Sequence, residues 1–148
     1  MFKYKQGFTL IETALVVFII AVMAILAFPV GVRFYKTQDL DSVCEGVLET
    51  LRRAQLKAMS VENDSAFGVY LGTGKTGYYS LFRGSSYEHK EDEEIFDISE
   101  NISFGGTLQE VVFSKLEGIP GSTGDIILTL NGDTETININ ELGRVNLK

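Results

Sequence analysis

The chain opens with an apolar stretch whose length is its most informative property. Positions 13–32 carry no charged residue, and a short polar leader with Lys3 and Lys5 precedes them. A helix rises about 1.5 Å per residue, so about 20 apolar residues are needed to cross the hydrocarbon core of a bilayer. The run therefore has the length of a membrane span.

Beyond Lys36 the pattern becomes amphipathic. From Leu40 to Ala58 apolar residues recur at three- and four-residue steps, with acidic and basic residues on the other faces. This spacing predicts one long helix from Phe8 that continues past the apolar run, with one apolar face that another part of the chain must cover. We expect Pro29, helped by Gly31, to bend this helix without ending it. The turn-forming residues 62–65 predict its end near positions 61–64.

The rest of the chain reads as β-structure. Short runs rich in β-branched and aromatic residues alternate with glycine-containing turns, which predicts an antiparallel sheet and an α+β fold. The glycine-rich residues 72–77 suit a hairpin loop, and Asn131-Gly132 suits a tight turn with positive φ. The expected strands cover residues 66–71, 78–83, 95–98, 102–104, 111–116, 125–130, 134–140 and 144–147.

The residues just before the apolar run form a specific motif. The sequence from Gly7 to Glu12 reads Gly-Phe-Thr-Leu-Ile-Glu. It resembles the class III signal of type IV pilins and pseudopilins. That resemblance implies cleavage between Gly7 and Phe8 by a prepilin peptidase, N-methylation of Phe8, and an assembly role for Glu12. Thr9, Leu10 and Ile11, which complete the motif, are implied to take part in assembly.

A finer resemblance points to the H-type minor pseudopilins of type II secretion and to related minor pilins. It rests on the end of the amphipathic helix around Arg53 and Ala54, on Gly118-Ile119-Pro120, and on the closing Gly143-Arg144-Val145. The family architecture is a long N-terminal helix followed by an antiparallel sheet. The expected organisation is a leader at 1–7, a kinked transmembrane and polymerisation helix at 8–36, and an extracytoplasmic domain at 37–148.

The resemblance implies a structural subunit of a pilus or pseudopilus and no enzymatic activity. Its partners would be other pilin or pseudopilin subunits, the prepilin peptidase and an inner-membrane assembly platform. The chain would sit in the plasma membrane as a single-pass protein, with a cytoplasmic N-terminus, before it enters the filament. Two alternatives stay open: a major pilin of a type IV pilus, and a membrane-anchored extracellular binding domain that does not polymerise.

The net charge of the chain bears on which kinds of partner it can bind. The net charge is −7, and loss of the leader lysines makes it −9. An acidic surface repels a phosphate backbone, so nucleic-acid binding is disfavoured. Cys44 is the single cysteine, which excludes an intramolecular disulfide, and its position on the apolar helical face predicts a small buried side chain.

Glu12 is the strongest candidate for a specific role. A carboxylate close to a bilayer is costly unless it is neutralised or paired. In a filament its partner would be the positively charged amine of Phe8 in a neighbouring subunit, a contact that would set the axial register. The alternative is a carboxylate that is merely solvated at headgroup depth.

The other polar clusters do not match known metal, catalytic or phosphate-binding sites. Residues 87–94 hold five carboxylates and predict a solvated, mobile loop, with calcium binding as the alternative; their spacing differs from an EF-hand loop. His89 is the only histidine, so neither a zinc cluster nor a catalytic triad is expected around it. Gly74-Lys75-Thr76 lacks the context of a phosphate-binding loop. We expect no metal, no cofactor and no catalytic residue.

Overall fold

The computed structural model describes the backbone of residues 9–148 and the side chains of residues 9–25 and 38–148. Its first element is α1 (Leu10–Met59), which continues through Pro29 and Gly31. The expectation that these residues do not end the helix is confirmed, and the bend itself stays a prediction. The chain divides into two compact units, Met1–Lys36 and Thr37–Lys148, and α1 contributes to both.

The end of α1 falls close to the predicted position. The helix stops at Met59 and a short 3₁₀ helix, η1 (Glu62–Asp64), follows. Val61, Asn63 and Asp64 all have positive φ, at 56°, 52° and 59°. A run of left-handed residues cannot continue a right-handed hydrogen-bond ladder, and left-handed valine is rare because its side chain branches at Cβ. These residues therefore terminate the helix.

The first sheet has the order β3-β2-β1-β5, with every neighbouring pair antiparallel. Its strands are β1 (Phe67–Tyr70), β2 (Tyr78–Gly84), β3 (Lys90–Asp97) and β5 (Glu110–Phe113). The loop between β1 and β2 is the predicted glycine-rich hairpin. In register, Gly68 pairs with Phe82 on one side and with Val112 on the other.

The second sheet has the order β4-β6-β7-β8, again antiparallel throughout. Its strands are β4 (Ile102–Gly106), β6 (Gly124–Leu130), β7 (Asp133–Ile139) and β8 (Val145–Leu147). Asn131 and Gly132 connect β6 to β7 with φ of 53° and 102°, which confirms the predicted tight turn. Backbone hydrogen bonds of 2.8 Å in both directions between Gly74 and Phe104 join the two sheets.

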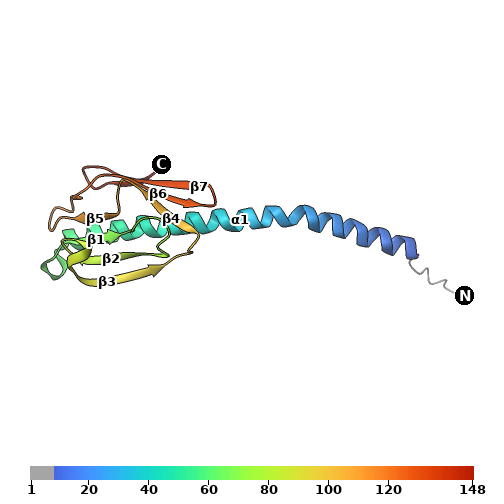
Figure 1. Ribbon diagram of the computed structural model, residues 1–148, viewed down its shortest axis with the longest axis horizontal. Helices are drawn as coiled ribbons and strands as arrows, with labels where there is room; N and C mark the ends of the chain where they lie inside the picture. The colour runs from blue at the N-terminus through green and yellow to red at the C-terminus, as the bar shows by residue number, and fades with distance from the viewer. Residues whose placement is uncertain (1–8) are drawn as a thin grey trace, which may run out of the picture. The chain divides into compact units, whose positions relative to one another are not determined.

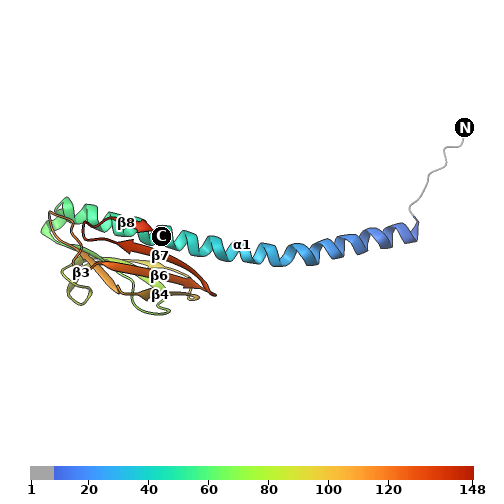
Figure 2. The ribbon, with the colours of Figure 1, turned by 90° about the horizontal axis from the view of Figure 1, so that it is seen from above.

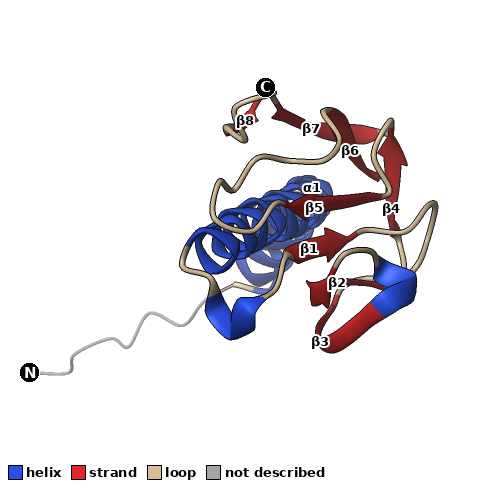
Figure 3. Ribbon diagram, turned by 90° about the vertical axis from the view of Figure 1, so that its left-hand side faces the viewer, coloured by secondary structure: helices blue, strands red, loops and turns tan. Residues whose placement is uncertain are grey.

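Both sheets pack on the C-terminal part of α1. Figures 1 and 2 show strands lying alongside this part of the helix, and Figure 3 shows one sheet below and beside it and the other above it. The buried helical face is the one that the sequence predicts. Its fully covered members are Leu40, Cys44, Val47, Leu51, Ala54 and Ala58.

Cys44 belongs to this core, as expected. Its side chain is buried, and desolvation, assisted by the negative charges of Glu135, Asp41 and Glu45, raises its pKa to about 11. The thiolate is the reactive form of cysteine, so a thiol with a raised pKa is poorly reactive. Cys44 therefore acts as a small apolar packing residue.

The expectation of a mobile loop at residues 87–94 is wrong. This region forms a second 3₁₀ helix, η2 (Tyr87–His89), and then the first half of β3, which begins five residues before the predicted strand. β3 pairs with β2 along its length, apart from an irregularity at Arg83 and Gly84. It is an edge strand, so its backbone pairs on one side only, and its carboxylates lie close to water except that of Glu93, whose side chain is 16% exposed.

Candidate functional site

The N-terminal part of α1 is the candidate site because its apolar side chains have no cover among the described residues. Every residue from Thr9 to Ile25 is exposed. The exposed fraction is 86% for Leu10, 76% for Ile11 and 68% for Phe18. Apolar side chains lie on all sides of this segment, so no rotation of the helix could hide them from water. The segment needs either lipid or other protein around it.

The first turn of α1 is organised by Thr9 and Glu12. The Thr9 carbonyl oxygen accepts hydrogen bonds from the backbone N–H groups of Glu12 (3.1 Å) and Thr13 (3.2 Å), and the Thr9 hydroxyl oxygen also accepts from Glu12 N–H (3.4 Å). This is one half of a capping box, in which the N-cap side chain bonds to the third helical N–H. Thr9 therefore fixes where the helix begins.

Glu12 is the only charged residue between positions 9 and 25. Its carboxylate accepts no hydrogen bond and forms no ion pair among the described residues. Its position in the first turn places negative charge beside the positive end of the helix dipole, which is worth about 0.3–1 kcal/mol. Glu12 thus has a stabilising local role and a carboxylate that remains available to an external cation.

A shallow apolar groove follows one face of this segment. Its lining residues recur every three or four positions and include small ones, which let another helix approach closely. They are Leu10, Thr13, Ala14, Val17, Phe18 and Ala21. A neighbouring apolar helix could pack along this groove.

The structure brings together part of the predicted set. Thr9, Leu10, Ile11 and Glu12 form the N-cap and first turn of α1. Gly7 and Phe8, the predicted processing and methylation residues, lie outside the described residues. Pro29 and Gly31 are described only as part of the backbone of α1.

Sequence reasoning missed the capping role of Thr9. The signal was present, since a threonine followed three residues later by glutamate, directly before an apolar run, is typical of a helix start.

Within the described part of the chain, no helix reaches the length and hydropathy that a membrane span requires.

The remaining polar candidates stay at the surface. His89 is exposed, and its Nδ1 lies 3.0 Å from the Ser86 hydroxyl oxygen. Among residues 9–148 as far as their side chains are described, no group of three or more His, Cys, Asp or Glu residues could hold a metal ion. Lys75 lies in the β1–β2 hairpin, followed by a strand rather than by the helix of a phosphate-binding loop.

The motif and the fold both have counterparts among known proteins. The family model described as the prokaryotic N-terminal methylation motif matches residues 2–28. No curated protein sequence matches the chain. The match places the segment with Gly7, Phe8 and Glu12 inside a known type of N-terminal sequence.

Similar solved structures are a minor pilin and a minor pseudopilin. The type IV minor pilin FimU of Pseudomonas aeruginosa superposes with a TM-score of 0.57 at 16% identity, covering 78% of this chain and 92% of FimU. The minor pseudopilin EpsH of the type 2 secretion system of Vibrio cholerae gives 0.58 at 11% identity, covering 74% and 96%. The predicted resemblance and the α+β fold are confirmed: this chain joins an N-terminal methylation motif to the fold of minor pilins and pseudopilins.

Proposed function

We propose that this chain is a structural subunit, a minor pilin or pseudopilin, of a type IV pilus or type II secretion pseudopilus. The observation that carries the proposal is the match of the methylation motif to residues 2–28, which include a helical segment, residues 10–25, whose apolar side chains are exposed on all sides. A domain that stays in water has no use for such a segment, whereas a membrane-anchored subunit that later polymerises uses it in both states. FimU and EpsH, which share the fold, are themselves described as a minor pilin and a minor pseudopilin.

The first step of the proposed life cycle is processing. Residues 1–7 are a leader that a prepilin peptidase removes, and Phe8 becomes the N-methylated first residue. Gly7 suits a scissile position because a peptidase that cuts beside a membrane helix needs close approach to the backbone, and glycine has no side chain to obstruct it. Cleavage here retains the apolar segment, whereas cleavage of a secretory signal discards it.

Before assembly, residues 8–36 anchor the chain in the plasma membrane and residues 37–148 lie outside the cytoplasm. The apolar surface of residues 10–25 would face lipid in this state. During assembly the same surface would exchange lipid for the apolar helices of other subunits, so it is never exposed to water. The assembly platform of the inner membrane would move the subunit between these two environments.

Glu12 would specify how subunits stack. Its carboxylate is unpaired among the described residues, and processing creates a new amine at Phe8. A charge-assisted contact between Glu12 of one copy and the Phe8 amine of a neighbour would favour one axial register over others. The groove that begins at Leu10 would add packing contacts without setting the register.

Mass spectrometry of the mature N-terminus tests the proposal most directly. Expression with a prepilin peptidase should yield a chain that begins with N-methylated phenylalanine at position 8. Expression without the peptidase should yield the intact leader, as should a Gly7→Leu variant with the peptidase present. A mature chain that still begins at Met1 when the peptidase is active would contradict the proposal.

The abundance of the subunit decides between a minor and a major role. Quantification of purified filaments should find this chain present in few copies relative to another pilin or pseudopilin. A filament built mainly from this chain would identify a major pilin. Correct processing without recovery in any filament would identify a membrane-anchored domain that does not polymerise.

A further inference from the structure

One edge of the first sheet, along β3, is free to pair with another strand. β3 pairs with β2 on one side and has no strand partner on the other side among the described residues. It is eight residues long, and a strand of this length at an edge presents a row of unpaired backbone N–H and C=O groups. Such an edge is a template for an added strand.

A cavity adjoins this edge on its inner side. It has a volume of about 230 Å³ and lies between the last turns of α1 and strands β2 and β3. Phe67 and Leu81 provide apolar surface. Its charged lining residues are Lys57 from α1, Arg83 from β2, and Asp92, Glu93 and Glu94 from β3.

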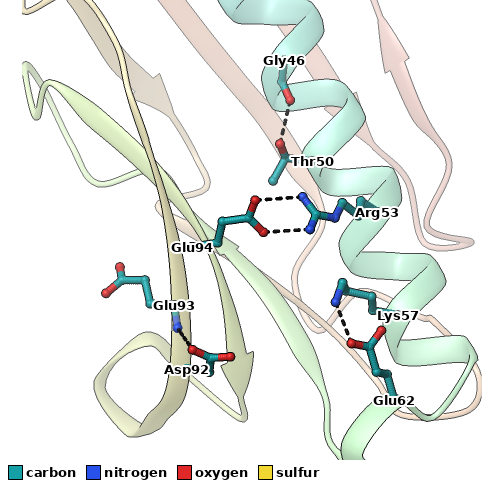
Figure 4. Close-up of polar contacts among 8 residues, drawn as sticks. All are labelled: Gly46, Thr50, Arg53, Lys57, Glu62, Asp92, Glu93 and Glu94. Atoms are coloured by element: carbon teal, nitrogen blue, oxygen red, sulfur yellow. Dashed lines mark hydrogen bonds and ion pairs between the residues drawn. The ribbon is translucent and has the colours of Figure 1, made fainter.

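Most charges around the cavity already have partners. The Arg53 guanidinium donates to both Glu94 carboxylate oxygens, at 3.1 and 2.8 Å, and Lys57 Nζ lies 2.7 Å from a Glu62 oxygen (Figure 4). Arg83 Nε lies 3.2 Å from Glu91 Oε2. These pairs neutralise much of the charge around the cavity.

Two carboxylates of β3 form no ion pair within the described residues, although Arg83 lies opposite Asp92 in the strand register. Asp92 accepts only a hydrogen bond from the backbone N–H of Glu93, at 3.0 Å, and Asp97 has neither a hydrogen bond nor an ion pair to the described side chains. Glu93 is held by Lys90, with Nζ 2.7 Å from Oε2. The edge is therefore negative, with Asp92 on the cavity side.

The opposite face of the edge has an apolar contact point. Alternate residues of a strand point to opposite faces, so Ile95 lies on the other side of β3 from Asp92 and Glu94. Its side chain is 56% exposed. An added strand would thus meet a carboxylate on the cavity side and an isoleucine on the outer side.

We propose that the β3 edge binds an extended segment of a partner protein that carries Lys or Arg on one face and apolar residues on the other. Backbone hydrogen bonds to β3 supply affinity, as in other cases of strand addition. The basic side chains of the segment lie beside Asp92, with their aliphatic stems over the cavity. The apolar side chains lie beside Ile95.

The same charges exclude a second copy of this edge. Two β3 strands paired across a new interface would bring several carboxylates opposite one another, and like charges directly opposite destabilise a strand pair. Specificity of this kind arises from repulsion of the wrong partner as much as from attraction of the right one. The occupant is accordingly a basic segment of another protein. This inference is independent of filament assembly through α1.

The test uses the full chain in detergent micelles and a fluorescent peptide as long as β3 that alternates Lys with Val. Fluorescence anisotropy should detect binding, and amide hydrogen exchange should show protection confined to residues 90–97. A peptide with the same side chains but N-methylated at alternate backbone nitrogens should bind at least about tenfold more weakly, because it lacks the donors for strand pairing. A peptide with Glu in place of Lys should not bind.

Charge variants locate the site. Asp92→Lys should weaken binding of the Lys-Val peptide by roughly fivefold, and Asp92→Asn by less. Asp133→Lys makes the same change in net charge on the second sheet and should leave binding unchanged. Circular dichroism of each variant checks that the fold is retained. The inference is overturned by equal binding of the N-methylated peptide, by equal weakening in both lysine variants, by protection away from β3, or by no binding up to about 1 mM.

Discussion

Two stretches of α1 contain similar apolar residues in opposite environments. Between Thr9 and Ile25 every side chain is exposed. Between Leu40 and Ala58 the apolar face is covered by two sheets, and residues such as Val47 and Leu51 have no exposed surface. The second stretch completes a core within the chain, whereas the first requires partners outside it. The two stretches differ in their charged residues. Charged side chains line the outer faces of the second stretch, whereas Glu12 is the single charged residue of the first.

The largest effect is expected from Glu12, the single charge of the exposed stretch. Glu12→Ala should abolish or nearly abolish incorporation into filaments while membrane insertion is unchanged, because the cation at a neighbour's Phe8 loses its partner. Glu12→Asp should retain part of the function. Filament yield in cells, measured by shearing and immunoblotting, checks this prediction.

The matched control is Glu117→Ala, which removes an exposed carboxylate from the domain and should leave filament yield unchanged. Wild-type yield from Glu12→Ala would remove the proposed pairing role. A subunit at the filament tip would be the exception, because it has no preceding subunit to contact.

A pair of leucine substitutions tests the comparison directly. Leu51→Ala deletes a fully buried side chain and should lower the free energy of unfolding of the domain by about 2–5 kcal/mol. Leu15→Ala truncates a side chain that is 57% exposed and should change it by less than about 0.5 kcal/mol. Denaturant unfolding followed by tyrosine fluorescence measures both. Similar losses from the two variants would show that the exposed stretch also supports the fold of the domain.

The elements that the sequence predicted well are those controlled by local patterns. The helical period fixes which residues of α1 face the sheets, from Leu40 to Ala58. Asn131-Gly132 fixes the turn between β6 and β7, since both residues tolerate positive φ. Ile137 and Ile139 lie two positions apart in the expected strand at 134–140, so they share one face, and both side chains are fully covered.

The elements that the sequence predicted poorly depend on pairing between strands that are far apart in the chain. Residues 90–94 have the composition of a solvated loop, and they become a strand because β2 supplies a hydrogen-bonding partner. Side-chain preferences alone do not reveal this, because strand propensity depends strongly on context. The pairing of β5 with β1, rather than with its sequence neighbours, likewise joins residues that are 40 to 46 positions apart. The candidate site was easier to locate because its motif is contiguous.

A smaller effect is expected from the ion pair that joins α1 to the edge strand β3 of the first sheet. Arg53 on α1 and Glu94 on β3 form a bidentate ion pair, but each side chain is 47% exposed. Solvent screening limits such pairs to about 0.2–1 kcal/mol. A double-mutant cycle with Arg53→Ala and Glu94→Ala, read from denaturant unfolding, should give a coupling energy in this range. A coupling of several kcal/mol would mean that the contact behaves as a buried pair.

The smallest effect concerns the dependence of domain stability on pH. Asn138 donates a hydrogen bond of 2.6 Å to Asp125, and with Lys148 it holds the pKa of this carboxyl below its ordinary value of 3.8. A depressed pKa in the folded state means that the ionised form favours folding. The contribution is fully present above the ordinary pKa and is lost as the pH falls through the depressed value.

An Asp125→Asn variant should therefore lose less stability than the wild type between neutral pH and pH values below about 4. Unfolding midpoints in urea at a series of pH values measure the difference. Asp133→Asn, which neutralises an exposed carboxylate that forms no ion pair with the described side chains, is the control and should follow the wild-type curve. Identical pH dependence in Asp125→Asn and the wild type would show that the contacts of Asp125 with Asn138 and Lys148 add nothing to folding. The acidic exterior of the domain would then respond to acid only through its collective charge.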